Sequence, residues 1–84
     1  MFRGLIESYI DKITNEDVIN FAKNDNVVVT NEEASLFIKT IKENKDDIFM
    51  GNGQKYIDSL KDKISPTAFE ELNYLWNKYK KFIG

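Results

Sequence analysis

Residues 13–41 read ITNEDVINFAKNDNVVVTNEEASLFIKTI and contain one short phrase twice. The ITNED of residues 13–17 returns as VTNEE in residues 29–33. In each copy a threonine, Thr14 or Thr30, is followed three residues later by an acid, which is the capping-box pattern of a helix N-terminus. This part of the chain is therefore predicted to form a helix, a short apolar link and a second helix.

The two copies predict similar hydrogen bonds. Each threonine side chain accepts a backbone N–H from the first helical turn, where that group has no partner inside the helix. Glu33 is long enough to bond back to the N–H of Thr30, and Asp17 is a shorter version of the same partner for Thr14. The acids of both first turns also suit the positive end of the helix dipole.

Three further helical patterns flank this stretch. Apolar residues recur at three- and four-residue steps in residues 2–13, in about residues 53–63 and in about residues 66–82. Ser65 and Pro66 form a strong start signal for the last helix, with Ser as cap and Pro at the first helical position. The residues predicted to face the core in these helices are Phe2, Leu5, Ile6, Tyr9, Ile10, Ile13, Tyr56, Ile57, Leu60, Ile64, Ala68, Phe69, Leu72, Leu75, Trp76, Tyr79, Phe82 and Ile83.

The fold class predicted is all-α. We expect a compact irregular bundle of about five short helices with orthogonal packing, because the links are short and no heptad pattern is sustained. The link at residues 27–29 is predicted to be buried or to form one very short strand. A chain of 84 residues with 42% apolar and 31% charged residues is expected to be a single domain over residues 1–84.

Composition argues against most catalytic and cofactor chemistry. The chain has neither Cys nor His, so the usual general base and the commonest transition-metal ligand are missing. The carboxylate pairs Asp46-Asp47 and Glu70-Glu71 do not converge, because adjacent helical residues point about 100° apart. We therefore expect a protein that is not an enzyme and needs no cofactor. With no signal-like or membrane-spanning segment, no membrane association and a cytoplasmic location are expected.

Residues 22–33 have the length of an EF-hand calcium loop and lie between two predicted helices. Asparagines at the third and fifth positions and Glu33 at the twelfth resemble such a loop. However, Ala22 stands where the first carboxylate is needed, and Val27 stands where the sharp turn needs glycine. Calcium binding is not expected.

Nucleic-acid binding is the alternative function. The helix that begins at Asn31 could be the reading helix of a helix-turn-helix, with Lys39 and Lys42 on it. Its first turn carries Glu32 and Glu33, which repel phosphates. A second basic and aromatic cluster consists of Tyr74, Trp76, Lys78, Tyr79, Lys80 and Lys81. Two of its aromatics belong to an apolar stripe, the lysines suit a helix C-terminus, and the net charge is −2, so nucleic acid is the less favoured partner.

The leading hypothesis is a non-enzymatic module that binds another protein or itself. Leu36 and Tyr74 are large side chains that point away from the apolar stripes of their own helices. If the two helices lie side by side, Leu36, Thr40, Tyr74 and Lys78 would form one surface patch. Single exposed apolar residues are ordinary, but tyrosine also supplies much of the energy of protein interfaces. These four residues are the candidate partner contacts.

Several segments together are similar to a family of small uncharacterised proteins from low-GC Gram-positive bacteria, grouped as a domain of unknown function. The segments are ITNED (13–17), Phe21-Ala22-Lys23, Thr30 to Ala34, Ile41-Lys42, Lys61 to Ser65 and Tyr79 to Phe82. The resemblance covers nearly the whole chain and consists of cap and core residues. It implies a compact helical cytoplasmic domain and transfers no functional residue.

Overall fold

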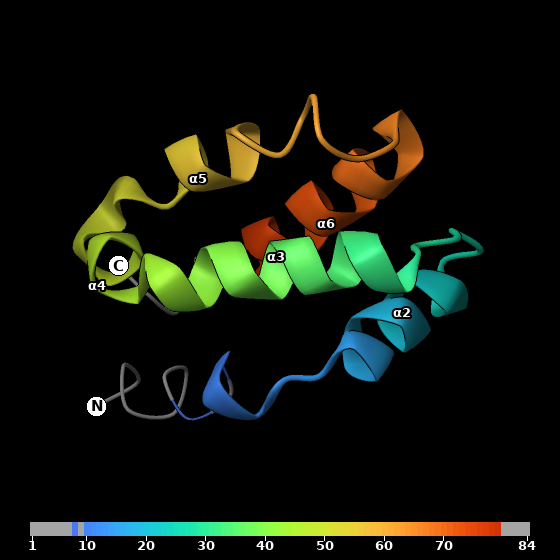
Figure 1. Ribbon diagram of the computed structural model, residues 1–84, viewed down its shortest axis with the longest axis horizontal. Coiled ribbons are helices and arrows are strands. Elements are labelled where there is room, and N and C mark those ends of the chain that lie inside the picture. The colour runs from blue at the N-terminus through green and yellow to red at the C-terminus, as the bar shows by residue number, and fades with distance from the viewer. Residues whose placement is uncertain (1–7, 9, 80–84) are drawn as a thin grey trace.

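The structure, a computed structural model, describes Ser8 and residues 10–79 and is helical, with no strand in that part of the chain (Figure 1). Its elements are α2 (Asn15–Asn24), α3 (Asn31–Glu43), α4 (Lys45–Asp47), the π-helical turn η1 (Ile48–Asn52), α5 (Gln54–Asp58) and α6 (Pro66–Tyr79). Residues 10–12 are helical as well. The all-α prediction is confirmed.

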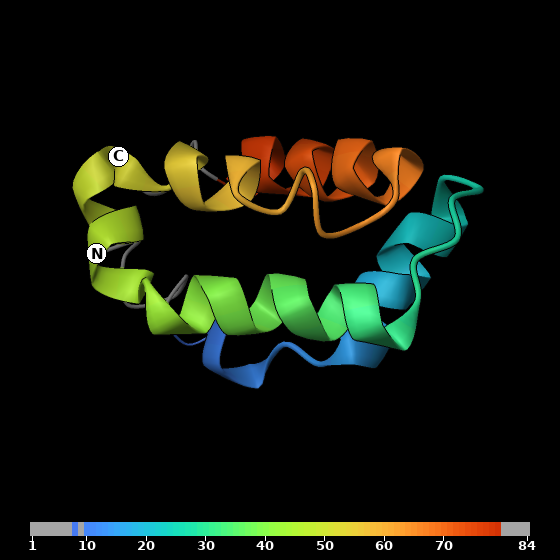
Figure 2. The same cartoon turned by 45° about the horizontal axis from the view of Figure 1, so that its top comes forward.

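The helices form two layers around a common core. Figure 2 shows α3 in one layer and α5 with α6 in the other, and α4 with η1 turns the chain between the layers at one end. Helix α2 crosses α3 near its N-terminus (Figure 1). The most deeply buried apolar side chains come from both layers and from the link after α2, and are Val18, Ala22, Val29, Ala34, Phe37, Ile48, Ile57, Leu60, Ala68, Leu72 and Leu75. Helix α3 is therefore covered on more than one side.

Both predicted capping boxes are present. The hydroxyl of Thr14 accepts the N–H of Asp17 at 3.2 Å, and the Asp17 carboxylate accepts the N–H of Thr14 at 3.0 Å. The corresponding distances between Thr30 and Glu33 are 3.1 Å and 3.0 Å. The shorter Asp17 side chain thus closes its box as well as Glu33 does, and both helices begin where the repeated phrase predicted.

Helix α2 ends in a Schellman motif. Asn26 has a left-handed backbone with φ of 61°, a conformation that asparagine tolerates better than most residues. The N–H of Asn26 bonds the carbonyl of Lys23 at 3.0 Å, and the N–H of Val27 bonds the carbonyl of Ala22 at 2.9 Å. These two bonds satisfy carbonyl groups that the helix itself leaves free.

The link that follows is extended and forms no strand within the described residues. Val29 is buried and Val27 is half-buried, but Val28 is 82% exposed. The alternative of a very short strand was wrong, because no partner strand exists in this part of the chain. The buried-link prediction is right for one valine and half right for another.

The fourth predicted helix is shorter than expected. Helix α5 ends at Asp58 rather than near residue 63, and the chain continues in tight turns. The hydroxyl of Ser59 donates to the carbonyl of Tyr56 at 2.6 Å, and the N–H of Lys63 bonds the carbonyl only three residues before it. Such local bonds compete with helix continuation. The inward residues Ile57 and Leu60 are nevertheless buried as predicted.

Helix α6 begins as predicted. The hydroxyl of Ser65 accepts the N–H of Ala68 at 3.2 Å, and Pro66 is the first helical residue. Gln54 of α5 then joins the two helices of this layer. Its Oε1 accepts the indole N–H of Trp76 at 3.1 Å, and its Nε2 donates to Oδ1 of Asn73 at 3.1 Å.

The ends of the predicted core lie outside the described residues. In the first helical pattern Ile10 is buried and Ile13 is half-buried. The residues outside the description are Phe2, Leu5, Ile6, Tyr9, Phe82 and Ile83, together with the side chain of Tyr79. Across the helices that are described, none combines the length and the apolarity that crossing a bilayer requires.

Candidate functional site

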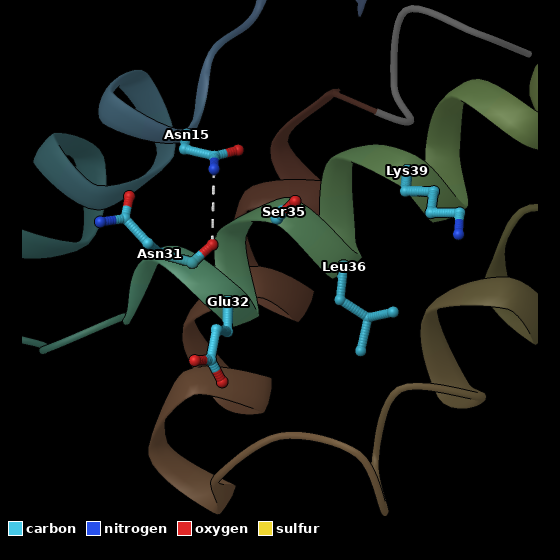
Figure 3. A pocket seen from close by; sticks show the side chains of 6 residues that line it. All are labelled: Asn15, Asn31, Glu32, Ser35, Leu36 and Lys39. Carbon is cyan, nitrogen blue, oxygen red and sulfur yellow. Dashed lines mark hydrogen bonds between the residues drawn. The ribbon is translucent and has the colours of Figure 1, made fainter.

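The N-termini of α2 and α3 are held next to each other. Asn15 is the first residue of α2, and its side-chain amide donates to the carbonyl of Asn31, the first residue of α3, at 3.5 Å (Figure 3). The two capping boxes fix the direction of both helix starts. The repeated phrase therefore builds one surface from residues sixteen positions apart in the sequence.

Two adjoining hollows lie on this surface. The first, of about 470 Å³, is lined by Asn15, Asn31, Glu32, Ser35, Leu36 and Lys39. The second, of about 600 Å³, is lined by Thr30, Glu32, Glu33, Leu36, Asp62, Lys63, Ile64 and Ser65. Both are lined by Glu32 and Leu36, so the hollows adjoin at these two side chains, and we name the pair of hollows the Leu36 groove. Figure 3 shows Glu32 and Leu36 projecting from the same side of α3.

Glu33 links α3 to the segment before α6, and both line the second hollow of the groove. One of its carboxylate oxygens accepts the N–H of Thr30, and the other accepts the N–H of Ser65 at 2.9 Å. Burial alone would raise the pKa of Glu33, but the hydrogen bonds from Ser65 and Thr30 together hold that pKa below its ordinary value. An ionised Glu33 therefore ties the start of α3 to the start of α6.

The four predicted partner contacts lie on two helices, Leu36 and Thr40 on α3 and Tyr74 and Lys78 on α6. Tyr74 and Lys78 are neighbours on α6, with the Lys78 ammonium 5.4 Å from the Tyr74 ring centroid. Leu36 lies in the groove and packs against the core, half-buried rather than exposed. Thr40 is half-buried, and its carbonyl accepts the side-chain amide of Asn44 at 2.8 Å. The expectation that Leu36 points fully away from the core was wrong, because α3 has neighbours on more than one side.

Tyr74 and Lys78 belong to a second feature, the contact between α2 and α6. The rings of Tyr74 and Phe21 are 6.3 Å apart between centroids, and the Lys78 ammonium lies 5.2 Å from the Phe21 ring. At the other end of this contact Glu71 faces Asp25, the C-cap of α2. We name these five residues the α2–α6 seam.

Glu71 is the residue that sequence reasoning missed. It is 7% exposed, and burial, followed by the neighbouring Asp25 carboxyl, raises the pKa of Glu71 to about 7. The sequence held a signal for this burial. Glu71 stands three residues after Ala68 and four before Leu75, both of which are buried, and such positions share a helix face.

The loop compared with a calcium site has other roles. Ala22 is fully buried in the core, Asn26 forms the left-handed turn, and Glu33 accepts two backbone N–H groups. In the part of the chain that the structure describes, no group of three or more acidic side chains is arranged to hold a metal ion. The Leu36 groove and the α2–α6 seam are two surface features that the described residues form.

Comparison with known proteins gives a family. No curated protein and no solved structure matches the chain. A family model described as "Protein of unknown function (DUF2624)" matches residues 1–80. The match spans the cap residues, the groove and the seam. The chain therefore belongs to this family of proteins of unknown function, as the resemblance in its cap and core segments indicated.

Proposed function

We propose that this protein is a non-enzymatic module that binds another protein through the Leu36 groove. The observation that carries the proposal is that two hollows meet at one half-buried apolar side chain, Leu36, and are rimmed by hydrogen-bonding groups. Protein-binding sites combine an apolar centre with a polar rim in this way. A partner would place an apolar side chain on Leu36 and polar groups against Asn15, Asn31 and Ser35.

The charges around the groove support a protein rather than a nucleic acid. Glu32 and Lys39 carry opposite charges on the same part of α3, and Asp62 and Lys63 do so on the other wall. A nucleic-acid backbone is attracted by a surface of one positive sign. Mixed charges instead set the orientation of a protein partner without raising its affinity for phosphate.

Site-specific photo-crosslinking in the native host tests the proposal. Ser35 lines the groove and its side chain is exposed, so a photoreactive residue placed there should capture the partner without disturbing the core. Met50 is 76% exposed and lies in η1, away from the groove lining, and a photoreactive residue there is the matched control. A protein captured from Ser35 and not from Met50 is the expected result.

A second variant separates binding from folding. Ser35→Arg would fill the first hollow. With the photoreactive residue moved to Lys39, which lines the same hollow, we expect Ser35→Arg to abolish capture while thermal melting stays close to that of the parent protein. Equal capture from both positions, or capture of nucleic acid from Ser35, would contradict the proposal.

We also propose that the protein acts in the cytoplasm, which cell fractionation with an antibody against the chain tests directly.

A further inference from the structure

Glu71 has an unusual environment for a charged residue. Within the described residues it is the single charged side chain that is buried, with 7% of its surface exposed. Its Oε2 atom is buried and has no hydrogen-bond partner among those residues. Buried polar atoms are almost always bonded, so an exception of this kind needs a physical reason.

Burial and the Asp25 carboxyl make the ionised form of Glu71 unfavourable, while the charge of Lys78 acts in the opposite direction. Asp25 faces it from α2 and Lys78 from its own helix. Asp25 is the C-cap of α2, where the helix dipole adds further negative charge. The Lys78 ammonium also makes cation–π contacts with two aromatic rings. It lies 5.2 Å from the Phe21 ring centroid and 5.4 Å from the Tyr74 ring centroid.

We propose that Glu71 and Asp25 form a proton-dependent contact that holds the C-terminal end of α2 against α6. When one proton is present, the protonated Glu71 carboxyl donates a hydrogen bond to the Asp25 carboxylate and the α2–α6 seam is closed. When this proton is lost to solvent, the buried Glu71 carboxylate faces the exposed Asp25 carboxylate. The last turn of α2 and the link at residues 25–29 then separate from α6.

Glu71 is expected to lose its proton near neutral pH. Burial and the Asp25 carboxyl raise the pKa of Glu71 to about 7, so a moderate rise in pH removes the proton. The contact lies outside the Leu36 groove and does not depend on the proposed function. It gives the α2–α6 seam a conformational response to pH.

Hydrogen exchange at two amides reports on the contact. The N–H groups of Asn26 and Val27 make the two bonds that close the end of α2, and we expect this turn to fray and break both bonds once it separates from α6. We would measure their exchange by NMR in the parent protein and in Glu71→Gln at about pH 5.5 and about pH 8.5, comparing the two proteins at the same pH. Glutamine is the neutral match of the protonated acid. Glu70→Gln is the control, since Glu70 is adjacent and exposed.

At the higher pH we expect both amides to exchange at least about tenfold faster in the parent protein than in Glu71→Gln, because each pKa unit of preference is a tenfold effect. At the lower pH the ratio should be close to one. Glu70→Gln should match the parent protein throughout. The amide of Ile38, in the interior of α3, should show no such ratio.

Several results would overturn the proposal. The ratio of exchange rates between the parent protein and Glu71→Gln could be the same at both pH values, or the Glu71 carboxyl could titrate near its ordinary value in carbon NMR. Either result would show that the proton-dependent contact does not form. An equal effect at Ile38 would show general unfolding instead. If Glu71→Gln does not fold, Asp25→Asn removes the facing charge and should slow exchange at the higher pH. No change in that variant would likewise contradict the proposal.

Discussion

A Cβ atom built on Gly53 would lie 2.4 Å from both Cζ2 and Cη2 of the Trp76 ring. The indole of α6 thus packs directly on the backbone at the start of α5. Trp76 is 6% exposed and its N–H is bonded to Gln54, so the ring has little freedom to move. A side chain at residue 53 and a tryptophan at residue 76 exclude each other.

Gly53→Ala is therefore expected to destabilise the protein through overpacking, by roughly 1–3 kcal/mol in the free energy of unfolding measured with urea. Gly51→Ala is the control. Gly51 has φ of 94° and no atom within 4 Å of a built Cβ, so its cost is backbone strain of about 1 kcal/mol. Trp76→Phe should reduce the penalty at residue 53 and leave the one at residue 51 unchanged. Additive effects at residues 53 and 76 would contradict this reading.

Glu33→Gln should destabilise the protein more than Glu32→Gln does at neutral pH, by about 1 kcal/mol, because only Glu33 accepts N–H bonds from Thr30 and Ser65. The folded protein lowers the pKa of Glu33 from 4.5. The contribution of the ionised Glu33 carboxylate to the free energy of unfolding is thus present above about pH 4.5. It is lost as pH falls through the pKa of Glu33 in the folded protein. Urea unfolding at neutral and acidic pH should show the two variants converging in acid. A constant difference would refute this role.

Ser65→Ala should lower the free energy of unfolding by about 1 kcal/mol through loss of the bond to the N–H of Ala68. Thr67→Ala is a suitable comparison, since Thr67 is an exposed hydroxyl in the same turn of α6. Urea unfolding of the two variants measures the difference. Equal effects would mean that the Ser65 hydroxyl is not acting as the cap.

Glu71 should make the whole protein less stable as pH rises. Its pKa is raised from 4.5 to about 7, so its contribution is fully present below about pH 4.5 and is lost as pH rises through about 7. The gain in unfolding free energy of Glu71→Gln over the parent protein should grow across this range to at most about 3 kcal/mol. Melting temperatures between about pH 4.5 and 8 measure it, with Glu70→Gln expected to show no trend.

Features that depend on residues close together in the sequence could be predicted from it. The caps at Thr14, Thr30 and Ser65 were foreseen because each hydrogen bond spans only three residues. Features set by packing between helices were not. Leu36 was expected to be exposed from the phase of its own helix, but α3 is covered on more than one side. Glu71 lies on the buried face of α6, which helix phase indicated, but helix phase alone does not reveal that Asp25 at the end of α2 faces it.

The groove and the glycines show the same division. The polar residues of the groove belong to a recognisable repeated phrase, but their convergence required the crossing of α2 and α3. Two glycines in the segment from Gly51 to Gly53 are a typical sign of a break in helical structure. That one glycine is needed for its backbone and the other for the space beside Trp76 depends on contacts across the two layers.

The two hydrogen bonds that Glu33 accepts have a consequence for the electrostatic field inside the protein. Helices α3 and α6 begin at the same end and run in the same direction (Figure 2), so their dipoles are parallel and two positive poles lie together. Helices packed in opposite directions would cancel such poles against each other. Here the carboxylate of Glu33, bonded to the first N–H groups of Thr30 and Ser65, acts as one counter-ion shared by two helix poles.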